Sequence, residues 1–136
     1  MLHRQREQLR PVGAAMGIEI ETRLSDQIAR YLDLATSEAK LTAANIANID
    51  TPGYRALGMD FEAEMRGAMD CVDQGRALRL VRVRAVEGLV ARPDGNNVSM
   101  DREGLNLAEA QLKFKTGVAL LRQEYQRVMD AIHADK

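Results

Sequence analysis

The sequence holds few of the residues that build an aromatic core or a reactive centre. Of its 136 residues 46% are apolar, but only 4% are aromatic and tryptophan is absent, which excludes a large aromatic-rich core. A single cysteine, Cys71, allows no internal disulfide, and the two histidines, His3 and His133, give no repeated Cys/His spacing for zinc. We therefore expect no cofactor and neither metal nor redox chemistry.

A strong charge and a long apolar run are also absent. The 19 Lys and Arg residues nearly balance the 20 Asp and Glu residues, so the formal net charge of -1 does not indicate a polyanion-binding protein. The longest apolar runs are far shorter than the roughly 18 residues that cross a bilayer, so no membrane span is expected. Residues 1–17 lack the apolar segment of a secretory signal, so any export would use another route.

No group of residues has the pattern of a catalytic site. No Ser or Cys nucleophile has a plausible His partner, because both histidines lie in terminal segments. Asp60, Glu62 and Glu64 are close in sequence, but no His or Lys accompanies them, which favours a solvated helix start over acid–base chemistry. We expect that the protein is not an enzyme.

Two long helical patterns bracket the chain. From Ile20 to Ile49 apolar and small residues recur at steps of three and four, with no Gly or Pro between them. A second pattern of this kind runs from Asp101, the expected N-cap, to the C-terminal end. Each stripe is wider than a two-helix seam, so pairing would leave apolar surface uncovered, which favours assembly. The residues that we expect to pack these helices are Leu24, Ile28, Tyr31, Leu112, Phe114, Leu121, Tyr125 and Val128.

The patterns divide the chain into four parts and predict a mainly α fold. We expect a disordered or non-native extension at residues 1–15, an N-terminal helix at 16–50, a turn and a small, partly β, loop-rich region at 51–100, and a C-terminal helix at 101–136. The best strand candidate is Leu78–Val86, where β-branched and Arg residues interleave. Pro52 and Gly53 end the first helix, with positive φ at Gly53 if the turn is type II.

The segment Leu41–Met65 contains an Asn-Ile-Ala-Asn motif, a Thr-Pro-Gly-Tyr turn followed by Arg55, and an Asp-Phe-Glu motif. These motifs resemble the signature of a known family, the bacterial flagellar basal-body rod proteins. Arg92–Leu121 is similar to the family's segment leading into its C-terminal helix, and together the two segments cover about 55 positions in the right order. The motif residues that the resemblance marks are Asn45, Asn48, Thr51, Pro52, Gly53, Tyr54 and Phe61.

The resemblance implies a structural subunit of the proximal rod that transmits torque from rotor to hook and filament. In this family the terminal helices pair as a coiled coil in the inner layer of a helical tube. The implied partners are copies of the chain, other rod proteins, the rod-base adaptor, and membrane-ring and export-gate components. The implied location is the basal body on the periplasmic side of the inner membrane, reached by flagellar type III export without a cleaved signal peptide.

Two other functions stay open at this point. One is a soluble helical adaptor or export-chaperone-like module that holds a helix of another axial protein in its groove. The weaker one is nucleic-acid binding by the four arginines between Arg76 and Arg84, although acidic neighbours dilute that cluster and no aromatic residues interleave with it. The rod-subunit hypothesis, with no nucleic acid as partner, is the leading one.

Overall fold

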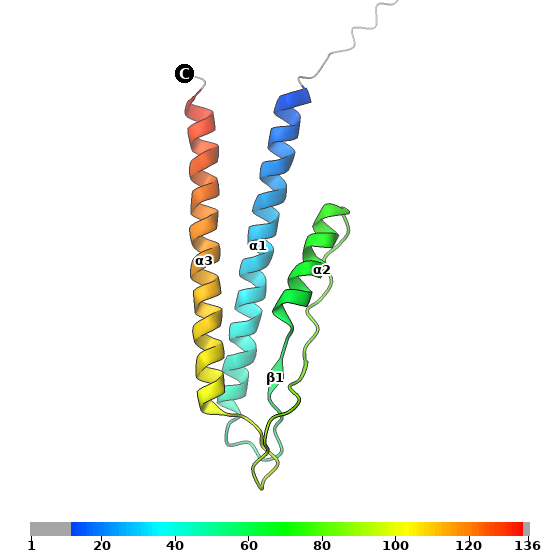
Figure 1. The fold of residues 1–136 in the computed structure, drawn as a ribbon, viewed down its shortest axis with the longest axis vertical. Helices are drawn as coiled ribbons and strands as arrows, with labels where there is room; N and C mark the ends of the chain where they lie inside the picture. The colour runs from blue at the N-terminus through cyan, green and yellow to red at the C-terminus, as the bar shows by residue number, and fades with distance from the viewer. Residues whose placement is uncertain (1–11, 135–136) are drawn as a thin grey trace, which may run out of the picture.

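The described part of the chain, residues 12–134 of this computed structural model, is mainly helical. Helix α1 spans Val12–Ala47, helix α2 spans Phe61–Asp73 and helix α3 spans Met100–His133. In Figure 1 α1 and α3 lie side by side and run in opposite directions, and α2 lies against the other side of α1. Residues 48–99 connect the two long helices of this hairpin, and the two family-like segments span the two ends of that connection. None of the helices in this range has an apolar stretch long enough to cross a membrane.

Helix α1 begins earlier than the sequence pattern predicted. Its backbone is helical from Val12, whereas residues 1–15 were expected to be disordered or non-native. The structure contradicts that expectation for residues 12–15, and residues 1–11 lie outside the described part. Alanine is the strongest helix former, so Ala14 and Ala15 favour helix without any apolar periodicity to reveal it.

The middle region contains less strand than expected. Strand β1, Leu57–Gly58, pairs antiparallel with strand β2, Arg84–Ala85, in the register Leu57 to Ala85 and Gly58 to Arg84. The prediction of a strand over Leu78–Val86 is confirmed only for residues 84–85, and it is wrong for residues 78–83 and Val86, which have no regular structure. Their side chains are largely exposed, with Leu80 at 92%, because β1 is too short to pair with more than the end of this segment.

Helix α2 starts as the carboxylate cluster predicted. The Asp60 side chain caps the helix by accepting a hydrogen bond from the Ala63 backbone N–H at 3.0 Å, and Glu62 and Glu64 lie in the first turn, where negative charge is favourable. Its buried residues are the small Ala68 and Cys71. Small side chains on this face let α2 lie close to α1.

Helix α3 begins at Met100, so the prediction of Asp101 as its N-cap is wrong by two residues. Ser99 is the N-cap, and its hydroxyl accepts from the Arg102 backbone N–H at 3.4 Å. Asp101 lies instead in the first turn with Glu103. Both positions suit a carboxylate at a helix start, which is why the sequence does not separate them.

The seam between α1 and α3 is lined by small and polar side chains. The buried residues of α3 are Glu103, Ala110, Gly117 and Glu124, one in every seven positions. A Cβ atom built on Gly117 would lie 2.5 Å from Leu32 Cδ2 and 3.0 Å from Tyr31 Cδ1. The two helices therefore approach closely at this point because Gly117 has no side chain.

Candidate functional site

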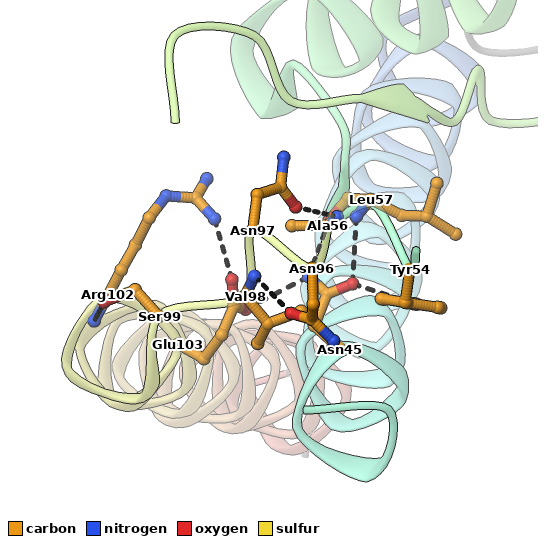
Figure 2. A network of polar contacts seen from close by, with 10 residues as sticks. All are labelled: Asn45, Tyr54, Ala56, Leu57, Asn96, Asn97, Val98, Ser99, Arg102 and Glu103. Atoms are coloured by element: carbon orange, nitrogen blue, oxygen red, sulfur yellow. Dashed lines mark hydrogen bonds and ion pairs between the residues drawn. The ribbon is translucent and has the colours of Figure 1, made fainter. Parts of the chain in front are cut away.

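Asn45, in the last turn of α1, is the centre of the polar network shown in Figure 2. Its Nδ2 group donates to the Leu57 carbonyl at 2.8 Å and to Glu103 Oε2 at 3.1 Å. Its Oδ1 atom accepts from the Leu57 backbone N–H at 2.9 Å and from the Tyr54 hydroxyl at 3.1 Å. These are the four hydrogen bonds that a primary amide can form, and the residue is 1% exposed. Asn45 therefore joins α1 to β1 and to α3.

Glu103 is the partner of Asn45 on α3, and the sequence analysis did not single it out. It is fully buried, and its second oxygen, Oε1, accepts from Arg102 Nη1 at 2.7 Å. A buried carboxylate needs hydrogen-bond partners, and this one receives a donor at each oxygen. The signal in the sequence was its position seven residues before Ala110 on the stripe, but a Glu there is expected in solvent.

The Thr51–Tyr54 turn redirects the chain after α1. The Tyr54 backbone N–H donates to the Thr51 carbonyl at 3.2 Å, and Gly53 has φ of 75°, which confirms the predicted positive φ. The Thr51 hydroxyl donates to Asn48 Oδ1 at 3.1 Å, while Asn48 Nδ2 donates to the Ala44 carbonyl. The two asparagines of the motif thus differ, since Asn48 bonds locally.

Replacement of Gly53 by Val should destabilise this turn through the backbone alone. A Cβ at Gly53 would meet nothing within 4 Å, so the cost comes from φ of 75°, where a β-branched residue is strained by about 1–3 kcal/mol. Gly53→Asn is the matched control, because Asn tolerates the left-handed region. We expect thermal unfolding to show a clearly lower midpoint for Gly53→Val than for Gly53→Asn. Equal midpoints would contradict the backbone explanation.

The loop before α3 holds the turn in place through Asn96 and Asn97. Asn96 Nδ2 donates to the Asn48 carbonyl at 2.9 Å and to the Thr51 carbonyl at 2.8 Å. Asn97 Oδ1 accepts from the Ala56 backbone N–H at 2.6 Å, and both asparagines are buried. The sequence analysis treated this stretch only as a family-like segment. The amide side chains of this stretch form hydrogen bonds with backbone atoms more than 40 residues away in sequence. A local sequence pattern does not indicate such long-range contacts.

Phe61 joins α2 to both long helices. Its ring meets the ring of Tyr31 on α1 edge-on, with centroids 5.5 Å apart. Lys113 of α3 places its Nζ atom 4.1 Å from the centre of the Phe61 ring and 2.9 Å from Glu38 Oε2 of α1. The motif residue Phe61 is therefore a packing anchor.

The expected helix-packing residues separate into two groups. Ile28 is buried, and Leu24, Tyr31, Leu121 and Val128 are partly buried. Leu112, Phe114 and Tyr125 are 66%, 46% and 64% exposed. The first group lies at or near the seam within this chain, and the side chains of the second group are exposed on α3.

The polar network formed by Asn45, Glu103, Asn96 and Asn97, called the junction from here on, fixes the relative positions of the segments that it connects. Its polar side chains come from α1, the loop before α3 and α3, and they bond to one another and to backbone atoms between Asn48 and Leu57. Within residues 12–134 no group of three His, Cys, Asp or Glu side chains is placed to hold a metal ion. What the arrangement can do is fix how the two long helices and the middle region leave a common point.

Comparison with known proteins gives one family. A family model described as "Flagella basal body rod protein" matches residues 36–55, which include Asn45, Asn48 and the Thr51–Tyr54 turn. A protein of Salmonella typhimurium named "Flagellar basal body rod protein FlgB" is 34% identical over 119 residues, which cover 74% of this chain and 86% of that protein. Proteins with the same name from Yersinia enterocolitica and Cereibacter sphaeroides are 30% and 33% identical, over 87% and 91% of their lengths.

Proposed function

Because this chain belongs to the flagellar basal-body rod protein family, we propose that it is a structural subunit of the proximal rod, built into a helical tube through its terminal helices. The names of its relatives describe a protein of the flagellar basal-body rod, which supports a structural role. The junction around Asn45 would set the angle at which the middle region leaves the helical hairpin. Each copy would then present the same surfaces to its neighbours.

One observation carries the assembly proposal, the open apolar face of α3. Large apolar side chains on this helix that are at least 45% exposed are Met100, Leu105, Leu112, Phe114, Leu120, Tyr125, Met129 and Ile132. This many large exposed apolar side chains on one helix are more than scattered surface residues, and they favour an interaction site. In the rod this face would pack against neighbouring subunits.

We also propose that α1 and α3 pair as an antiparallel coiled coil. The buried and partly buried residues of α1 that support it recur at steps of three and four, at Leu24, Ile28, Tyr31, Ala35, Glu38, Thr42 and Asn45. Such a heptad-like repeat opposite the seven-residue spacing of α3 is typical of a coiled coil. Its packing with other subunits would let the rod carry torque.

The proposed partners follow the family relationship. They are copies of this chain, other rod proteins, the rod-base adaptor, and components of the membrane ring and export gate. The proposed place is the basal body on the periplasmic side of the inner membrane, reached by type III export without a cleaved signal peptide. A soluble adaptor or export-chaperone-like module remains the alternative, and it would use the same open face of α3.

A charge on the open face should separate assembly from folding. We expect Leu112→Asp and Tyr125→Asp to change the free energy of unfolding of the purified chain by no more than about 0.5 kcal/mol, since both side chains are exposed. In cells that lack the native gene, the same variants should form few basal-body rods and swim poorly, because the carboxylate would be buried between subunits.

The control is Gln111→Ala, a neighbouring exposed position, which should restore rods and swimming. Electron microscopy of isolated basal bodies counts the rods. If cells without the gene keep their rods, the chain is not a rod subunit. If the rods form normally with Leu112→Asp and Tyr125→Asp, this face of α3 is not an assembly surface.

A further inference from the structure

Helix α3 buries two carboxylates at equivalent positions along its seam with α1. Glu103 and Glu124 are 21 residues apart, which is three seven-residue repeats, and their side chains are 0% and 5% exposed. Residues at this spacing share one face of a helix in a coiled-coil arrangement, so both side chains are directed toward α1. The two positions can therefore be compared directly.

The two carboxylates are satisfied to different degrees. Glu103 receives one donor from α1, the Asn45 amide, and a second from Arg102. Glu124 receives a single donor, Arg127 Nη1, at 3.2 Å from Oε2, and the Arg127 side chain is 62% exposed. Glu124 Oε1 is buried and has no hydrogen-bond partner among the described residues. A buried carboxylate oxygen without a donor is unfavourable and calls for a partner.

A cavity adjoins Glu124 on the side of the seam that α2 does not reach. Its volume is about 170 Å³. Its lining residues are Leu24 and Ile28 of α1 and Leu120, Gln123, Glu124 and Arg127 of α3. Where α1 offers an amide to Glu103, it offers two aliphatic side chains here, and residues 12–22 contain no Lys, Arg or His. Arg23 of α1, next to Leu24, pairs with Asp73 of α2, and Arg30 donates to the Arg79 carbonyl, so both are engaged elsewhere.

The open surface of α3 carries cations that lack a partner. Arg102, Lys113 and Arg127 each form an ion pair with a glutamate. Lys115 and Arg122 are exposed and form no ion pair with another described residue. Both lie beside the open apolar face, Lys115 three residues after Leu112 and Arg122 three before Tyr125, so each would enter a subunit contact with apolar neighbours.

Resting on the proposed function, we propose that Glu124 accepts an ion pair from Lys115 or Arg122 of a second copy of this chain. The cation enters the cavity, and the apolar side chains next to it cover Leu24, Ile28 and Leu120. Glu124 Oε1 is buried, so its carboxylate turns toward the cavity mouth when the cation enters. A charged pair enclosed by apolar contacts fixes the position of one copy along the other, because a shifted copy would leave the carboxylate unpaired.

Replacing Glu124 by a neutral residue tests whether its carboxylate is needed for the contact between subunits or for the stability of the single chain. Glu124→Leu removes the buried carboxylate, so the purified chain should unfold at the same or a higher temperature than the wild type. In cells without the native gene, the same variant should form at least tenfold fewer rods. If Glu124→Leu forms rods in wild-type number, the proposal is overturned. Loss of rods with Leu112→Asp in the same experiment would still leave the proposed function standing.

Charge reversal identifies the partner. Glu124→Lys should lose rods, and combining it with Lys115→Glu or with Arg122→Glu should restore the count to within twofold of the wild type. If neither combination restores rods, the second copy does not supply the cation and the proposal is wrong. Deletion of residues 1–11 removes Arg4, Arg6 and Arg10, and rod loss equal to that of Glu124→Leu would assign the cation to this chain's own N-terminal segment instead.

Discussion

The variant Asn45→Leu should lower the free energy of unfolding by about 3–5 kcal/mol, because it leaves a buried carboxylate and three other polar groups each without one hydrogen bond. Leucine has a similar size but bonds to nothing, so Glu103 Oε2, the Tyr54 hydroxyl and both backbone groups of Leu57 lose a partner. Denaturant titration of the purified chain measures the change. Rod assembly should fail as well, because the middle region would no longer be held to the helices.

Two further variants test the reason for this loss. Asn48→Ala removes only local bonds to Ala44 and Thr51, and should cost about 1 kcal/mol. The double variant Asn45→Leu with Glu103→Leu also removes the buried carboxylate that Asn45→Leu leaves with one donor fewer, and should recover part of the lost stability. A loss at Asn45 no larger than that at Asn48 would show that the four bonds of Asn45 do not hold the junction.

The variant Gly117→Val should have the second largest effect, by forcing α1 and α3 apart. Its Cβ alone would lie 2.5 Å from Leu32 Cδ2 and 3.0 Å from Leu32 Cγ, so Leu32 or the helix must move. Overpacking of this kind costs about 1–3 kcal/mol, and the β-branched side chain places the expected loss at the upper end. Thermal unfolding of the purified chain measures it.

Gly104→Ala is the matched control for Gly117, because it changes a glycine of the same helix. A Cβ on Gly104 would meet nothing within 4 Å, so the change should stabilise the chain by about 1 kcal/mol through helix propensity. Gly117→Ala should fall between the two, since it has the same gain and a smaller clash. If Gly117→Val and Gly104→Ala unfold at the same midpoint, close packing at Gly117 is not a source of stability.

The long helices could be predicted from the sequence, but not which face of α3 is buried. Of the packing residues expected on α3, Leu121 and Val128 are partly buried, but Leu112, Phe114 and Tyr125 are exposed. The chain instead buries the small Gly117 and the charged Glu124. Close approach decides between the faces, because Ala110 and Gly117 let α1 come near and the large side chains beside them would hold it away. The periodicity of a sequence indicates where large apolar side chains recur. It does not indicate where small side chains allow two helices to approach closely.

The family resemblance was sufficient to locate the candidate site in the sequence. The hydrogen-bond partners of its residues could be identified only from the folded structure. The motif marks Asn45, but its partners Leu57 and Glu103 lie 12 and 58 residues further along the chain. The strand prediction failed for a similar reason, because a strand needs a partner and β1 has only two residues to offer. Capping residues, in contrast, act within three or four positions, so Asp60 could be interpreted from sequence alone.

The small side chains of the α1 and α3 seam determine how the free subunit responds to heat and denaturant. Ala35, Ala110 and Gly117 cover little apolar surface, so opening the hairpin exposes little new surface to water. Both the heat-capacity change and the denaturant sensitivity of unfolding grow with that exposed surface. Unfolding of the free subunit should therefore depend only weakly on temperature and denaturant concentration. A sharp, cooperative unfolding transition would then be expected only in the assembled rod, where neighbouring subunits would cover the large side chains of α3.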